Sequence, residues 1–154
     1  MKRLGGFLIG LPAAIVVVFA GLGMYSKTGG PPGIQNGQLA ACPSKPNCVS
    51  SESAPSDSHS IPGIQIGSTV GKDPLESAQK SITELGGQVN FTSDNYLAAT
   101  FTSGLFGFVD DLEMQIDSGS GLIHVRSASR VGYSDFNVNR KRVEALRAKL
   151  TQTK

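Results

Sequence analysis

The sequence has no tryptophan, and its aromatic residues are limited to seven phenylalanines and three tyrosines among 154 residues. Proteins that hold single-stranded nucleic acid stack the bases on aromatic rings, so this scarcity argues against such a platform. An excess of one charge is also lacking, because 14 lysines and arginines balance 12 acidic residues and leave a net charge of +2. Nucleic-acid affinity depends on neutralising phosphates with basic residues. We therefore expect no nucleic-acid partner.

Charged residues are absent from one long N-terminal run. Lys2 and Arg3 are followed by residues 4–24 without a single charge, and about 20 apolar residues span a bilayer as a helix. Two interpretations of residues 1–25 stay open. An uncleaved transmembrane anchor suits the length of the run, whereas a cleaved signal peptide would use the small residues within 18–20 as a modest cleavage site.

Both interpretations place the rest of the chain outside the cytoplasm. Basic residues that precede a membrane segment remain on the cytoplasmic side. The sequence therefore predicts a location at the inner (cytoplasmic) membrane, with the N-terminus inside and membrane contact through residues 4–24. The domain is then expected in the periplasm or another extracytoplasmic space.

The two cysteines, Cys42 and Cys48, are the only ones in the chain. In an exported protein, two cysteines this close together favour a local disulfide, which would stabilise the fold by about 2 kcal/mol. Two thiolates alone make an incomplete zinc site, and neither His59 nor His124 has finger-like spacing. We expect no metal and no cofactor. Residues 26–41, rich in Gly and Pro, are predicted to be a flexible linker between membrane and domain.

Residues 42–154 are predicted to form a single α+β domain. Asp73 followed by proline is typical of a helix start, and apolar residues recur at helical spacing until Leu85. Four strands are expected from alternating or β-branched segments, and a last helix follows. The fold class is thus an antiparallel sheet of about four strands with two helices on one face, after an N-terminal transmembrane helix. The expected strands are 89–91, 96–102, 108–117 and 122–130, and the last helix is 139–150.

The hairpin formed by the third and fourth of these strands predicts an ion pair. Arg126 lies on the polar face of its strand, and the turn is compatible with two registers. One register places Glu113 opposite Arg126, and the other places Asp111 there. As a cross-strand pair exposed to solvent, it would contribute about 0.2–1 kcal/mol.

The side chain of Asp110 points to the opposite face of the sheet from those of Asp111 and Glu113, so it faces the core. A buried carboxylate needs a partner, and the available donors are the nearby serines and an arginine from the chain that follows, Arg130 or Arg140. A polar cluster is therefore predicted where the last strand gives way to the last helix. It could be a structural network that docks the helix, or a site that holds an anionic group between Arg130 and Arg140. The candidate cluster consists of Asp110, Ser127, Ser129, Arg130, Asn139 and Arg140.

Three sequence blocks resemble a known family. They are CPSKPNCVSS, FVDDLEMQID and RSASRVGYSDFNVNRKRVEAL, and together they are similar to the bacterial and plant family known as domain of unknown function 1499, over about residues 42–150. Members often carry an N-terminal membrane segment. The family pattern usually has Gly at the position of Asn137, which tolerates the same left-handed backbone conformation. The resemblance implies no activity.

Three functions are compatible with these features. The first is a membrane-tethered binding or accessory module whose partner is a membrane protein or an anionic small molecule. The second is a hydrolase or transferase that uses Ser127 or Ser129 with Asp110, although a serine nucleophile needs a nearby base and His124 has the wrong parity. The third is a purely structural subunit of a membrane complex. The absence of a recognisable nucleophile and base makes a binding function the better hypothesis, and we expect no catalytic residues.

Overall fold

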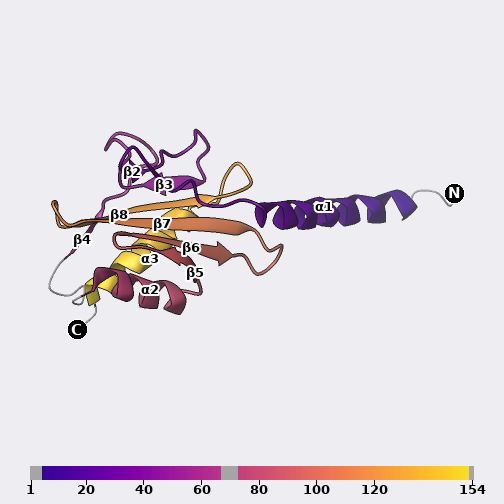
Figure 1. Cartoon of the computed structure of the whole chain (residues 1–154). Coiled ribbons are helices and arrows are strands. Elements are labelled where there is room, and N and C mark those ends of the chain that lie inside the picture. Colours follow the sequence, from indigo (N-terminus) through magenta and orange to yellow (C-terminus); the bar gives the residue numbers. More distant parts are fainter. Residues whose placement is uncertain (1–4, 67–72, 153–154) are drawn as a thin grey trace.

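The computed structural model of the chain describes residues 5–66 and 73–152 (Figure 1). The helices are α1 (Gly5–Ser26), α2 (Pro74–Glu84) and α3 (Val138–Gln152). The strands are β1 (Ile34–Gln35), β2 (Gln38–Leu39), β3 (Cys48–Ser50), β4 (Ile64–Gln65), β5 (Gln88–Thr92), β6 (Tyr96–Thr102), β7 (Val109–Asp117) and β8 (Leu122–Ser129).

An antiparallel sheet forms the centre of the domain. Its strands are ordered β3-β8-β7-β6-β5, and β4 also pairs with β8. Helices α2 and α3 both cover one face, the lower one in Figure 1. The predicted α+β class and the four central strands are confirmed. β3 and β4 were not predicted as strands, because segments of three and two residues carry no readable alternation.

Local sequence explains the helix α2 and its end. The carboxylate of Asp73 accepts hydrogen bonds from the backbone N–H groups of Leu75 and Glu76, and such a cap satisfies donors that the first turn leaves free. After the helix, Gly87 passes close to the core. A Cβ at this position would lie 2.6 Å from Cζ of Phe101 and 2.7 Å from Cγ2 of Ile82, so the chain can return into β5 only through a residue without a side chain.

The main core lies between the sheet and the two helices. The alternation of β7 directs Leu112 and Met114 to this side, and both are fully buried. Removing such side chains from water is the main stabilising contribution to a fold of this size. The other fully or nearly fully buried members are Ile61, Ile64, Ala78, Ile82, Leu97, Ala99, Ile123, Val125, Val143, Leu146 and Leu150.

The opposite face of the sheet is covered by residues 26–42, and here the predicted flexible linker is wrong. Leu39 packs with Tyr96 and Ala98 in a second, smaller core, and the β1–β2 hairpin lies along the sheet above β7 and β8 (Figure 1). The backbone N–H of Gly33 donates to Glu113. The segment is ordered because its backbone donors and its apolar residue find partners on this face, which composition alone does not reveal.

Helix α1 covers most of the apolar N-terminal run and extends away from the sheet (Figure 1). Within residues 5–66 and 73–152, no helix qualifies as a membrane span by its length and apolarity. The expected transmembrane helix is thus not found in the part of the chain that the structure describes.

Candidate functional site

A buried ion pair lies on the face of the sheet that residues 26–42 cover. Glu113 is directly opposite Arg126, which selects one of the two registers left open by the sequence, and Arg126 Nη1 donates to Glu113 Oε2 over 2.9 Å. The other carboxylate oxygen accepts from the Tyr96 hydroxyl at 2.9 Å and from the Gly33 N–H at 2.8 Å. The Glu113 side chain is 0% exposed and that of Arg126 is 7% exposed. The expected solvent-exposed pair is therefore wrong, because the covering segment excludes water.

Burial controls the ionisation of this group. Loss of contact with water raises the pKa of Glu113 above its usual range, and the hydrogen bond from Tyr96 and the charge of Arg126 oppose that rise. Burial also raises the pKa of Tyr96, and the neighbouring carboxylate of Glu113 adds to the effect. Tyr96 is therefore a stable hydrogen-bond donor at neutral pH.

Arg130 lies on the same face but is not part of the predicted cluster. It forms a two-pronged ion pair with Asp111, with donor–acceptor distances of 2.9 and 2.7 Å. A third bond, 3.1 Å long, runs from Arg130 Nη1 to the carbonyl oxygen of Ser26 at the end of α1. Such paired hydrogen bonds between guanidinium and carboxylate are strong and directional. Arg130 thus fastens α1 to the sheet.

Asp110 faces α3, as its parity predicts, but its partner is neither Arg130 nor Arg140. Arg142 Nη2 donates to Asp110 over 2.6 Å, and the guanidinium of Arg142 lies 4.4 Å above the ring of Phe101. Arg140 instead donates to the carbonyl oxygens of Ser58 and Ser60. The difference follows from helical geometry, because residues three apart share a face and Arg142 follows the buried Asn139 by three positions.

Asn139 is the centre of this polar cluster and is fully buried. Its side-chain N–H₂ lies 3.0 Å from the Asn47 carbonyl oxygen, 3.0 Å from Ser129 Oγ and 2.8 Å from Asp135 Oδ2. Its side-chain oxygen accepts from Ser127 Oγ at 2.6 Å and also from Arg142. Buried polar groups of this kind stabilise a fold only when they are satisfied. The network therefore docks the start of α3 against β8.

The candidate cluster of the sequence is thus divided between two faces and the outer side of α3. Asp110, Ser127, Ser129 and Asn139 come together, whereas Arg130 and Arg140 bind other groups. Both arginines already donate within the domain, so the geometry gives no support to an anion held between them. Ser127 is 0% exposed and donates to Asn139, so it is not placed for attack on a substrate.

A serine–histidine contact occurs elsewhere and was not anticipated. Ser51 Oγ lies 3.4 Å from His124 Nδ1 and also accepts from the backbone N–H of Val125 at 2.8 Å. A separation of 3.4 Å is long for a hydrogen bond to a hydroxyl. The shorter bond, between Ser51 Oγ and the Val125 N–H, ties the loop after β3 to β8. The missing signal was the β3–β8 pairing, which brings Ser51 beside His124.

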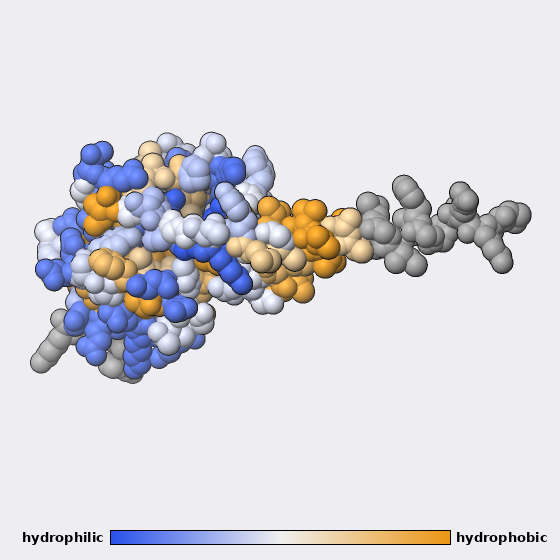
Figure 2. Space-filling view, turned by 45° about the vertical axis from the view of Figure 1, so that its right-hand side comes forward, coloured by the Kyte–Doolittle hydropathy of each residue, from blue (hydrophilic) through white to orange (hydrophobic). Residues whose placement is uncertain are grey.

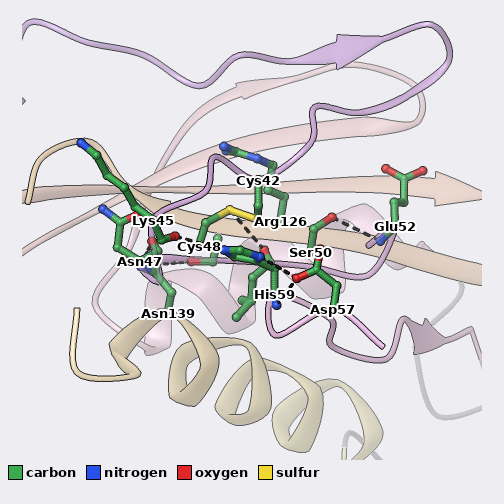
Figure 3. Close-up of a disulfide and its surroundings, with 12 residues drawn as sticks. Cys42, Lys45, Asn47, Cys48, Ser50, Glu52, Asp57, His59, Arg126 and Asn139 are labelled. Atoms are coloured by element: carbon green, nitrogen blue, oxygen red, sulfur yellow. Dashed lines mark hydrogen bonds and ion pairs between the residues drawn. A yellow bond between two sulfur atoms is a disulfide. The ribbon is translucent and has the colours of Figure 1, made fainter. Parts of the chain in front are cut away.

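The predicted disulfide between Cys42 and Cys48 is confirmed (Figure 3), with an S–S distance of 2.00 Å and a Cα–Cα distance of 5.7 Å. It joins the end of the covering segment to the first residue of β3. His59 lies across from it and contacts Asp57 and the Lys45 carbonyl oxygen. The disulfide therefore ties residues 26–42 to the edge strand β3, and His59 contacts the loop between the two cysteines at Lys45.

A groove of about 340 Å³ opens between the β1–β2 hairpin, the disulfide and the loop after β3. Two of its lining residues are acidic, Glu52 and Asp57, and none is basic. The backbone N–H of His59 lowers the pKa of Asp57 by hydrogen bonding to its carboxylate. The groove suits polar or cationic groups rather than anions. It is lined by Gln35, Asn36, Gln38, Leu39, Ala40, Ala41, Cys42, Ser50, Glu52, Ser53 and Asp57.

In the described residues, His, Cys, Asp and Glu side chains do not gather in groups of three or more that could hold a metal ion.

In a comparison with known families, the family described as "Protein of unknown function (DUF1499)" matches residues 38–150. The chain belongs to this family, as the three sequence blocks indicated. Neither a curated protein nor a solved structure matches.

Proposed function

We propose that this DUF1499 protein is a membrane-anchored extracytoplasmic module that binds a membrane-protein partner through the groove beside its disulfide. The observation that carries the anchor is the uncharged, apolar surface of α1. Its residues 13–22 are all exposed, although the domain has closed cores of its own. Contiguous apolar surface of this kind marks contact with lipid or protein. The exposed fractions are 50% for Ile15, 54% for Val16, 70% for Val17, 58% for Val18, 42% for Phe19 and 41% for Leu22.

An uncleaved anchor is favoured over a cleaved signal peptide by the contacts of α1. The helix continues without interruption past Ala20, and its last residue, Ser26, is 1% exposed. Ser26 Oγ accepts from the backbone N–H of Val109, and the Ser26 carbonyl accepts from Arg130. Cleavage after Ala20 would cut this continuous helix six residues before Ser26 and would remove Phe19, whose ring lies 5.3 Å from that of Phe106 in the domain.

Two further observations support an extracytoplasmic position. Lys2 and Arg3 precede the apolar run and are expected to stay in the cytoplasm. The disulfide lies on the other side of that run, and disulfides persist in oxidising compartments outside the cytoplasm.

Binding is favoured over catalysis by the state of the polar groups. The buried carboxylates and arginines of both faces are hydrogen bonded to one another, so these side chains stabilise the fold. The groove is more open, because Gln38 is exposed and the Asp57 side chain, whose Oδ1 accepts from the backbone N–H of His59, is still 44% exposed. A partner that offers amide or amino groups would complement these acceptors.

Photo-crosslinking in membranes tests this proposal. A photoreactive amino acid replaces Gln38 in the full-length chain, and a second version carries it at Lys80, which is exposed on α2. We expect a defined adduct with a membrane protein from position 38 and none from position 80. Equal crosslinking from both positions, or none from position 38, would refute the groove as the binding surface.

A charge variant sharpens the result. Ser53→Lys places a cation in the groove and should abolish the adduct, while Ser56→Lys, in the same loop but outside the lining, should leave it unchanged. If both variants crosslink like the parent, the partner does not occupy the groove. Extraction of membranes at alkaline pH tests the anchor separately, because an anchored chain remains in the pellet and a peripheral one is released.

A further inference from the structure

The loop between β6 and β7, residues 103–108, packs against the last turns of α1. The contact is so close that a Cβ at Gly23 would overlap the carbonyl oxygen of Phe106. The backbone of the loop lies directly against the helix here, so any side chain at position 23 would push the loop away from α1. This contact sets the position of the loop relative to α1.

Aromatic rings extend the contact along the helix. The ring of Phe19 lies 5.3 Å from that of Phe106 and 6.2 Å from that of Phe108, and the two loop rings are 6.1 Å apart. Leu105, at the tip of the loop, is 83% exposed and makes the loop more apolar. Figure 2 shows hydrophobic residues gathered where α1 meets the domain.

The depth of the loop follows from these contacts. If residues 4–24 occupy the bilayer, residue 24 marks the outer end of the run. Phe19 then lies five residues deeper, roughly 7.5 Å along a helix that rises about 1.5 Å per residue. The rings of Phe106 and Phe108 lie at most 6.2 Å from that of Phe19, so they lie no farther out than the level of residue 24. Phenylalanine and leucine at that level lie at the boundary between headgroups and acyl chains.

We propose that the loop of residues 103–108 is a second membrane contact, which inserts Leu105, Phe106 and Phe108 into the outer boundary of the bilayer beside α1. This rests on the proposed function, since the depth of the loop depends on the anchor. The occupant of the surface is lipid, because the loop continues the apolar surface of α1. Lys27 lies beside the loop, since its Nζ would be 3.7 Å from a Cβ on Gly107, and a lysine at this place can extend its ammonium group to the headgroups while its stem stays on apolar surface.

One consequence is a fixed orientation of the domain. With the β6–β7 loop at the bilayer, the opposite end of the sheet, where the β7–β8 turn lies, points away. The nine residues of β7 separate the two ends by roughly 27 Å at about 3.4 Å per residue, counted over eight intervals. The domain is held upright on the membrane and does not hang from a flexible tether.

Single-tryptophan fluorescence tests the insertion directly, because the natural chain contains no tryptophan. Full-length Leu105→Trp, Val17→Trp and Ser118→Trp variants are reconstituted in phosphatidylcholine–phosphatidylglycerol vesicles, with and without bromine on the acyl chains. Val17 is an exposed position on α1 and Ser118 an exposed position in the β7–β8 turn. We expect bromolipid to quench the Leu105→Trp and Val17→Trp variants strongly and to leave Ser118→Trp unchanged. Phe108→Trp is the second reporter in the loop and should behave like Leu105→Trp.

The outcomes separate the two proposals. If Val17→Trp is quenched while Leu105→Trp and Phe108→Trp are no more quenched than Ser118→Trp, the anchor stands and the loop does not enter the membrane. If Val17→Trp is not quenched either, the anchor itself is refuted, and the loop insertion with it. Equal quenching of Ser118→Trp would refute the upright orientation.

Discussion

Replacing Arg126 by methionine isolates the contribution of the buried ion pair. The variant leaves Glu113 with two neutral donors, Tyr96 and Gly33, and no positive charge beside a carboxylate that is 0% exposed. Breaking a buried pair in this way costs about 3–5 kcal/mol, far more than loss of an exposed pair at about 0–1 kcal/mol. The double variant Glu113→Gln with Arg126→Met removes both charges and keeps an acceptor for Tyr96. We expect it to recover most of the loss.

The pH dependence gives an independent signature. Burial raises the folded-state pKa of Glu113, so the folded protein binds its proton more tightly than the unfolded chain, where the pKa is about 4.3. The free energy of unfolding therefore falls as the pH rises above about 4.3 and levels off beyond the folded pKa. Loss of Arg126 raises that pKa further. The difference between parent and Arg126→Met should be smallest in acid and should grow toward neutral pH.

Guanidinium unfolding of the full-length protein in detergent, followed by circular dichroism between pH 4 and 8, measures both effects. A loss below about 1 kcal/mol for Arg126→Met at pH 7, with no dependence on pH, would contradict a buried, water-free ion pair. It would show that water reaches the pair and that residues 26–42 do not seal this face of the sheet.

Three further predictions concern other parts of the fold. Asn139→Ala leaves several buried groups without partners, each costing about 1–3 kcal/mol, so thermal unfolding should shift strongly, whereas exposed Lys141→Ala should change stability by less than about 0.5 kcal/mol. Replacing both cysteines by serine should lower the free energy of unfolding by about 2 kcal/mol, and an added reductant should then have no further effect. Gly87→Ala should cost about 1–3 kcal/mol through overlap with the core; the matched control Gly104→Ala, which has open space around it, should be neutral, and equal melting temperatures for the two would contradict the contact.

The central sheet could be predicted from the sequence because its two faces differ in polarity. Leu112, Met114 and Ile116 alternate with charged or polar residues, so the period of two was visible along β7. The same parity placed Asp110 toward α3 and Glu113 on the other face. The sheet was predictable because the alternation along β7 is a local pattern that a single sequence contains.

The cover over the second face could not be predicted in the same way. Residues 26–42 contain glycine, proline and polar side chains, and their order comes from distant partners such as the Gly33–Glu113 hydrogen bond. Without that cover, Glu113 and Arg126 resemble a solvated pair. The error about the linker therefore caused the error about the ion pair.

The partner of Asp110 was missed for a different reason. Arg130, Arg140 and Arg142 all follow the strand closely, and sequence proximity does not distinguish them. The choice depends on where α3 begins and how it is rotated, which buried Asn139 determines by binding Asn47 and Ser129. Helical spacing from Asn139 would have selected Arg142, had the burial of Asn139 been known.

The intact mass of the chain recovered from alkali-washed membranes of producing cells tests the uncleaved anchor and the extracytoplasmic position of the domain in one experiment. We predict a membrane-bound species that retains residues 1–25 and is two hydrogens lighter than the reduced chain, since Cys42 and Cys48 are joined. A soluble species that begins after Ala20 would contradict the uncleaved anchor, and a membrane-bound species with two free thiols would contradict the position of the domain in an oxidising compartment.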